Sequence, residues 1–345
     1  MCNITDFVKI RGGKTFAELP FTPVDAAVLC QLSYLKFEYM PDNASLLDSL
    51  SAEGRERLFE DDRFGDLQRE LYFEAVFSRR YRDMRIGFVI SEKLEYPELC
   101  FCAMMFYPVG GAPVVVFRGT DEYVIGWKED FNMAFMAPVP SQLMSADYLS
   151  RAAERLEGPF FVCGHSKGGN LAVYSAVCSP AEVRDRIKLV YNLDGPGFRR
   201  DITDREEYRE LRSRIMKLIP EKSFVGGLLR DMSVCSVIES RGMGIMQHVM
   251  FNWTVDEFGD FIFKKESLPP RSSRLSDNIE SLSEEQLKSF VEALFAVLKG
   301  ASVNNFAEFQ KNWIKDSRRL LAAYSGLDSR THRLVSETVS ELLKL

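Results

Sequence analysis

The stretch that decides the fold is Phe160-Phe-Val-Cys-Gly-His-Ser-Lys-Gly-Gly-Asn-Leu-Ala-Val-Tyr174. Its first four residues form an apolar run typical of a buried strand, and helical apolar spacing begins at Leu171. Between them, Gly164-His-Ser-Lys-Gly168 has the spacing of a sharp strand-to-helix turn known as a nucleophile elbow. The two glycines leave room where backbones crowd, and the turn presents the Ser166 hydroxyl above the sheet edge. The context therefore favours a serine nucleophile over a glycine-rich turn with an exposed serine.

The rest of the chain predicts strands that alternate with helices, which is typical of a mostly parallel sheet wrapped by helices in the α/β class. Apolar β-type runs lie at 85–90, 98–106, 113–117, 160–163, 187–193, 215–219 and 233–238. Helical spacing lies at 24–32, 142–157, 167–178 and 204–214. The first three strands should form a hairpin that leads into the centre of the sheet.

The length of 345 residues and the apolar fraction of 46% suit one enlarged domain with helical additions. We expect the core to span residues 1–270, with a charged, helix-like excursion or cap at about 41–80. A C-terminal helical extension over 271–345 should pack on this core, after a linker at 268–273. Its capping box, Ser283-Glu-Glu-Gln286, begins an amphipathic helix. These C-terminal helices could also join copies of the chain into a homo-oligomer.

Composition excludes several classes of protein. A net charge of −6 and the lack of a dense Lys/Arg patch argue against a nucleic-acid partner. The seven cysteines are scattered and mostly lie in apolar runs, with no Cys-x-x-Cys pair, so we expect reduced core thiols and no metal. No stretch approaches 18 uninterrupted apolar residues, and the first 13 residues lack the apolar region of a secretory signal. The expectation is a cytoplasmic protein without a transmembrane segment.

A nucleophilic serine needs a base, and the chain has three histidines. His165 is held in the elbow itself and is expected to be structural. His332 lies in a polar C-terminal helix with no motif near it, which is typical of a solvated side chain. His248 follows the last expected strand, at the edge of the sheet where this architecture supplies its histidine. We therefore expect His248 to be the general base.

A carboxylate must orient that base, and two candidates lie between the serine and the histidine. Asp194 ends the strand at 187–193 and precedes the sharp Gly195-Pro-Gly197 turn. Glu221 ends the strand at 215–219 and is followed by Lys222. Asp194 is favoured because an aspartate after a clean apolar strand has fewer surface explanations than a glutamate beside a lysine. A turn-capping role for Asp194 is the competing interpretation.

The negatively charged intermediate needs hydrogen-bond donors, and two are expected. The backbone N–H of Lys167 follows the nucleophile at the positive end of a helix. Thr120 follows the strand at 113–117 and can offer its N–H and hydroxyl. The aromatic and methionine-rich segment 123–136 comes next, and fits equally a lid over an acyl pocket and an ordinary packed helix.

Two motifs together resemble the lipase branch of the α/β-hydrolases. They are Val114-Val-Val-Phe-Arg-Gly-Thr-Asp121, with Trp127 and Asp130 downstream, and Gly164-His-Ser-Lys-Gly-Gly169. Over about 110–255 the arrangement is similar to the fungal-type (class 3) triacylglycerol lipases.

A closer resemblance, over nearly the whole chain, is to a bacterial family of uncharacterised hydrolase-like proteins called Mbeg-like. It rests on three segments: Gly164-His-Ser-Lys-Gly-Gly-Asn-Leu-Ala172, Asn192-Leu-Asp-Gly-Pro-Gly-Phe198 and Gln247-His-Val-Met-Phe-Asn-Trp253. The resemblance implies an α/β-hydrolase fold, with Ser166 as nucleophile, His248 as base, and Thr120 with Lys167 at the oxyanion hole.

The chain departs from the lipase pattern at two points. Lys167 stands where an apolar or neutral residue usually follows the serine, and no Asp-Pro-Val motif follows the strand at 215–219. The second departure leaves the choice between Asp194 and Glu221 open. Asp194-Gly-Pro-Gly instead looks like the acid position of pancreatic-type lipases.

These features favour a serine hydrolase that cleaves acyl esters, including lipids, through a covalent acyl-enzyme and without a cofactor. A thioesterase or amidase would use the same residues. A binding or scaffold protein that keeps the fold without turnover is the alternative from another class.

Overall fold

The computed structural model describes residues 2–60, 62, 64–95, 99–120, 132–133, 138–198, 200–221, 223, 225–227, 229, 235–242 and 244–264, with isolated residues between 283 and 335. In these ranges the chain forms one seven-stranded sheet in the order β1-β2-β3-β4-β5-β6-β7.

The sheet is mixed and mostly parallel, which confirms the expected α/β class. An antiparallel meander comes first, formed by β1 (Arg85–Leu94), β2 (Leu99–Tyr107) and β3 (Val114–Phe117). The next four strands continue parallel to β3: β4 (Phe160–His165), β5 (Ile187–Leu193), β6 (Ile215–Pro220) and β7 (Cys235–Ile238). The carboxyl ends of these parallel strands share one edge of the sheet, where residues that follow them come together.

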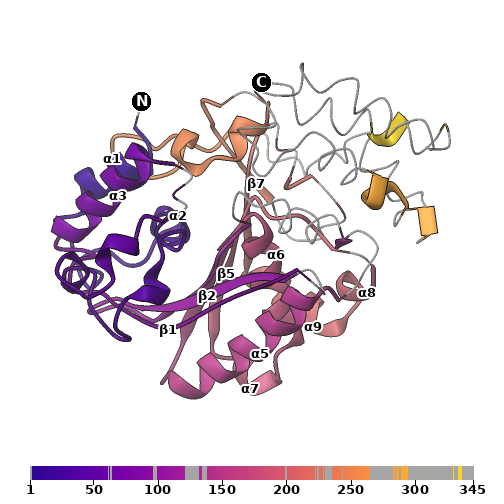
Figure 1. Ribbon diagram of the computed structural model, residues 1–345, viewed down its shortest axis with the longest axis horizontal. Helices are drawn as coiled ribbons and strands as arrows, with labels where there is room; N and C mark the ends of the chain where they lie inside the picture. Colours follow the sequence, from indigo (N-terminus) through magenta and orange to yellow (C-terminus); the bar gives the residue numbers. More distant parts are fainter. Residues whose placement is uncertain are drawn as a thin grey trace.

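Helices cover both faces of the sheet (Figure 1). On one face lie α1 (Ile4–Arg11), α2 (Pro23–Leu32) and α3 (Asp66–Phe77). On the other lie α5 (Pro140–Arg155), α6 (Lys167–Cys178), α7 (Ala181–Arg184), α8 (Arg200–Thr203) and α9 (Glu206–Leu211). Strand side chains alternate between the two cores: Met104 and Phe106 face the first, whereas Ala103 and Met105 face the second.

The helix expected around 204–214 is observed as α9, which begins two residues later and continues into a 3₁₀ turn over Arg212–Arg214. Arg205, the residue before α9, has the extended backbone angles φ −67° and ψ 147° that are typical of a helix N-cap. The predicted helix is therefore confirmed, with a later start.

The excursion expected at 41–80 packs into the core beside α1 and α2. Short 3₁₀ turns at Asp48–Leu50 and Arg55–Arg57 lead into α3. Leu46, Leu58 and Leu71 are buried in the same apolar cluster as residues of the central strands. This part of the chain therefore covers one face of the sheet.

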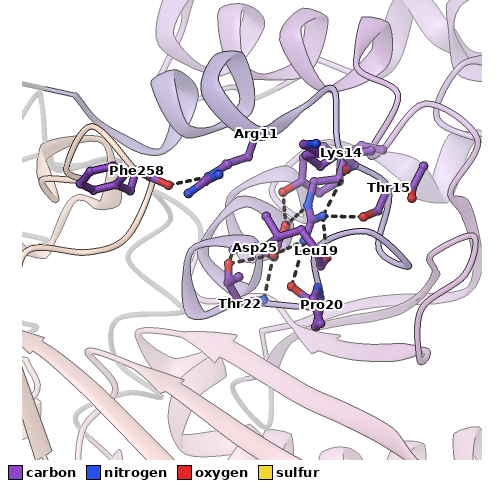
Figure 2. A network of polar contacts seen from close by, with 10 residues as sticks. Arg11, Lys14, Thr15, Leu19, Pro20, Thr22, Asp25 and Phe258 are labelled. Carbon is purple, nitrogen blue, oxygen red and sulfur yellow. Dashed lines mark hydrogen bonds and ion pairs between the residues drawn. The ribbon is translucent and has the colours of Figure 1, made fainter.

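A buried ion pair joins Arg80, which follows α3, to Asp25 on α2. Arg80 donates from Nη2 and Nε to the two carboxylate oxygens of Asp25, at 2.6 and 2.7 Å, and both side chains are fully buried. Arg80 also donates to the backbone carbonyl oxygens of residues 14, 15, 19 and 20, so that its guanidinium closes the loop before α2. Figure 2 labels these four residues beside Asp25. Burial, with the charge of Asp25, raises the pKa of Tyr81, so its hydroxyl stays a donor to that carboxylate.

The C-terminal segment is described at few positions. The capping box is present as expected, because Ser283 N–H donates to the Gln286 side chain at 3.0 Å and Gln286 N–H donates to the Ser283 hydroxyl at 3.2 Å. The linker at 268–273, the domain boundary and His332 lie outside the described residues. Among the helices that are described, none is long and apolar enough to cross a membrane.

Candidate active site

Ser166 occupies a strained turn between β4 and α6. Its φ of 57° and ψ of −131° lie where residues other than glycine are rarely found, as a nucleophile elbow requires. A Cβ on Gly164 would collide with the backbone of Gly168, and one on Gly168 would collide with the carbonyl oxygen of Phe117. Both glycines are therefore required by close backbone contacts. Ser166 is half-buried between the fully buried His165 and Lys167.

Strand pairing brings the next candidate, Asp194, to the same edge of the sheet. The N–H of Ser166 donates to the carbonyl oxygen of Leu193 at 2.9 Å, so the elbow is bonded to the end of β5. Asp194 follows Leu193 directly, and its own N–H donates to the carbonyl oxygen of Leu218 on β6 at 2.8 Å. Its φ of 52° is also left-handed. The two strained residues thus follow the ends of neighbouring parallel strands.

Asp194 is hydrogen bonded to His248. Oδ2 of the carboxylate lies 2.6 Å from Nδ1 of the imidazole, a length typical of a charge-assisted hydrogen bond. Asp194 is 0% exposed and the His248 side chain 11% exposed, so little water competes for this contact. The hydroxyl of Ser223 donates to the other carboxylate oxygen, Oδ1. Asp194 therefore fixes Nδ1 of His248, which leaves Nε2 as the nitrogen for proton transfer.

Glu221 has a different surrounding. Its carboxylate lies 3.7 Å from Nζ of Lys264, and its side chain is 44% exposed. The carboxylate that contacts His248 is that of Asp194, and the glutamate takes part in an ion pair at the surface.

His248 is presented by a compact loop. It ends a 3₁₀ turn over Gly244–His248, and a second turn, Met250–Asn252, follows at once. The indole of Trp253 is fully buried and donates from Nε1 to the carbonyl oxygen of Gln247 at 2.8 Å. This hydrogen bond joins the last residue of the Gln-His-Val-Met-Phe-Asn-Trp motif, Trp253, to the first, Gln247, which directly precedes His248.

His165 contacts His248, which the sequence expectation of a structural residue did not include. Nε2 of His165 lies 2.9 Å from the backbone carbonyl oxygen of His248. The two imidazole rings also stack, with centroids 4.4 Å apart and planes inclined by 28°. On its other side, Nδ1 of His165 lies 3.2 Å from the hydroxyl of Tyr34, which follows α2.

The expected oxyanion donors belong to the segments that carry Ser166 and Gly119. Lys167 is the first residue of α6, and its side chain is turned away into the core, where Nζ donates to the carbonyl oxygen of Cys100 at 2.6 Å. The segment after β3 passes close to the serine, because a Cβ on Gly119 would lie 3.2 Å from Cβ of Ser166. Thr120 comes next and is buried. The suggested lid lies mostly outside the described residues, which resume at 132–133 and 138.

A second network holds the turn that carries Asp194. Nδ2 of Asn170, on α6, donates to the carbonyl oxygens of Pro196 and Gly197 at 3.3 and 2.8 Å. Gln142 on α5 donates in turn to Oδ1 of Asn170 at 2.9 Å. The helix behind the serine and the turn behind the aspartate are therefore tied together, which stiffens the site.

No three His, Cys, Asp or Glu side chains of the described ranges are grouped so that they could hold a metal ion. An imidazole and a buried carboxylate are in contact here, and Ser166 follows the end of the neighbouring strand.

Fold and site together define the class. A mostly parallel sheet with an elbow between β4 and α6, and an aspartate–histidine pair at the carboxyl edge, is the arrangement of the α/β-hydrolase fold. The model of the Mbeg1-like family matches residues 75–296, and the chain belongs to this family.

No curated protein matches the sequence. Among solved structures, the chain is similar to one described as the crystal structure of M37 lipase, with 14% sequence identity and a TM-score of 0.40. That similarity covers 61% of this chain and 70% of the other.

Proposed function

We propose that this protein is a serine hydrolase that cleaves acyl esters, with Ser166 as nucleophile, His248 as general base and Asp194 as the orienting acid. The observation that carries the proposal is the 2.6 Å contact between the buried Asp194 carboxylate and Nδ1 of His248, at the sheet edge where the strained Ser166 is also found. A turn-capping aspartate would not need a histidine partner. A surface histidine would not need a fully buried carboxylate.

In the proposed reaction, Nε2 of His248 takes the hydroxyl proton of Ser166 as Oγ attacks the ester carbonyl carbon. The tetrahedral intermediate collapses as the imidazolium gives this proton to the leaving alcohol, which departs and leaves an acyl-serine. Water then attacks the acyl group and loses a proton to His248. The acid is released as the imidazolium returns this proton to Oγ, which regenerates Ser166. Throughout, the Asp194 carboxylate stabilises the imidazolium and keeps Nδ1 protonated.

Two donors are proposed for the oxyanion: the backbone N–H of Lys167 and a donor from Thr120. The close approach of Gly119 to Ser166 supports this assignment, because it brings the segment after β3 beside the nucleophile. The aromatic and methionine residues of segment 123–136, most of which lies outside the described residues, suit a lipid-like acyl chain by their composition.

The experiment is hydrolysis of a series of p-nitrophenyl esters from acetate to palmitate by the wild type and Ser166→Ala. We expect medium and long chains to be preferred, and Ser166→Ala to lose at least about 10³-fold in turnover. A matched thioester and anilide series distinguishes a thioesterase or an amidase. Turnover of no substrate, together with wild-type folding, would favour the non-catalytic scaffold, and equal rates for Ser166→Ala would exclude this site.

A further inference from the structure

The contacts of His165 specify the tautomer of its neutral ring. A carbonyl oxygen only accepts, so the 2.9 Å contact with the His248 backbone requires a proton on Nε2 of His165. In the neutral ring Nδ1 is then an acceptor, and it faces the hydroxyl of Tyr34 at 3.2 Å. The neutral Nε2–H tautomer thus uses both ring nitrogens. Tyr34 supplies the donor that selects it.

We propose that His165 and Tyr34 form a positioning pair for the catalytic base: Tyr34 sets the tautomer of His165, and His165 holds His248 by its backbone carbonyl and by ring stacking. This inference rests on the proposed function of His248. His165 contacts the backbone carbonyl and the ring of His248, and Tyr34 contacts His165, so both act through the base.

The stacking contact sets the direction of the catalytic ring. Asp194 holds only one atom of His248, Nδ1, and a single hydrogen bond leaves the ring free to tilt about it. The His165 ring, 4.4 Å away and inclined by 28°, contacts one face of the imidazole and limits this tilt. Trp253 supports His165 in turn: the two rings make a T-shaped contact with their centroids 6.2 Å apart.

Tyr34 is itself fixed by residues from distant parts of the chain. The rings of Phe64 and Tyr34 make a T-shaped contact with their centroids 6.2 Å apart. Phe64 also packs against Phe251, which lies three residues beyond His248. A Cβ on Gly119 would collide with the Tyr34 hydroxyl, so the glycine beside Thr120 is what admits it. Tyr34 and Phe64 both precede residues 75–296, the part of the chain that matches the family model. The N-terminal segment therefore contributes to the site through this contact.

The test compares three variants. His165→Gln keeps an N–H donor that reaches about as far from the backbone as Nε2, His165→Leu has similar bulk without a donor, and Tyr34→Phe removes only the hydroxyl. Tyr39→Phe is the matched control, because Tyr39 is an exposed tyrosine stacked under Arg57. We expect His165→Leu to lower kcat about 10²-fold with KM changed less than twofold, since a misplaced base costs turnover and not binding. His165→Gln should recover at least about tenfold of that loss, and Tyr34→Phe should lower kcat about threefold to tenfold.

Nuclear magnetic resonance of histidine-labelled protein tests positioning without turnover. The downfield proton of His248 Nδ1 should be sharp in the wild type and His165→Gln, and shifted or broadened in His165→Leu. If the wild type has no hydrolase activity, the proposed function fails and this signal alone judges the positioning pair. The pair is refuted if His165→Leu leaves kcat and the Nδ1 proton unchanged, or if His165→Gln is as impaired as His165→Leu. Should His165→Leu fail to fold, Tyr34→Phe and His165→Gln decide by the same criteria.

Discussion

Replacing Asp194 by Asn changes the charge at the base while keeping the shape of the side chain. Its amide oxygen can accept from the Ser223 hydroxyl, as Oδ1 does in the wild type, and its amide nitrogen then donates to Nδ1 of His248. The buried turn is also held by Asn170 through the carbonyl oxygens of Pro196 and Gly197. We therefore expect the variant to fold, with a free energy of unfolding within about 2 kcal/mol of the wild type.

The catalytic loss can be estimated from the contact. Charges on the carboxylate and the imidazolium about 4 Å apart, at an effective dielectric constant of about 20, attract by about 4 kcal/mol. Loss of this attraction lowers the rate about 10³-fold, since each tenfold step corresponds to about 1.4 kcal/mol. The asparagine also stabilises the wrong tautomer, which brings the expected loss in kcat to about 10⁴-fold.

The assay is ester hydrolysis with burst-phase kinetics, together with urea unfolding to establish that the variant is folded. Glu221→Gln is the control, because it removes a carboxylate at the neighbouring strand end that lies 3.7 Å from Nζ of Lys264 at the surface. An exposed ion pair stabilises a protein by about 0–1 kcal/mol, and we expect kcat within twofold of the wild type. A folded Asp194→Asn with near-normal kcat, or a larger loss for Glu221→Gln, would refute the reasoning.

Further predictions concern stability and thiol reactivity. Arg80→Met removes the cationic partner of the fully buried Asp25 carboxylate and should lower the free energy of unfolding, measured in urea, by about 3–5 kcal/mol. Adding Asp25→Asn should recover part of this loss. An unchanged midpoint of urea unfolding in Arg80→Met would contradict the importance of the buried ion pair. Burial raises the pKa of the Cys163 thiol, so this thiol should resist alkylation in the native protein. At pH 8 we expect iodoacetamide to modify the half-buried Cys2 first and Cys163 only after unfolding, as measured by peptide mass spectrometry. Early alkylation of Cys163 would contradict its burial.

Much of the fold follows from local patterns. The glycine at 164 is required by a contact within one strand-turn-helix unit, with the backbone of Gly168. The glycine at 168 is required where the turn approaches Phe117 of β3, and the spacing of the two glycines indicates the elbow. Strand and helix positions agree with the apolar runs because each element buries its own periodic face. The helix expected around 204–214 begins two residues later, at Glu206, because no local signal marks Arg205 as extended.

The residues that contact His165 and Asp194 could not be predicted from the sequence. Tyr34 contacts His165 across 131 positions, and Ser223 contacts Asp194 across 29. Neither residue stands in a motif, and no periodicity relates residues so far apart. The expectation that His165 is structural overlooked its contact with His248 for the same reason, since the loop that carries His248 is brought to it by the tertiary fold.

The most direct test of the central claim is labelling of the native protein with a fluorophosphonate, followed by mass spectrometry of the peptide that contains residues 160–174. We expect one adduct, on Ser166, and none in Ser166→Ala. In His248→Ala the adduct should form at least about 10³-fold more slowly, because labelling by the probe, like ester hydrolysis, requires the activated hydroxyl. An adduct that persists in Ser166→Ala, or a folded wild type that never reacts, would contradict it.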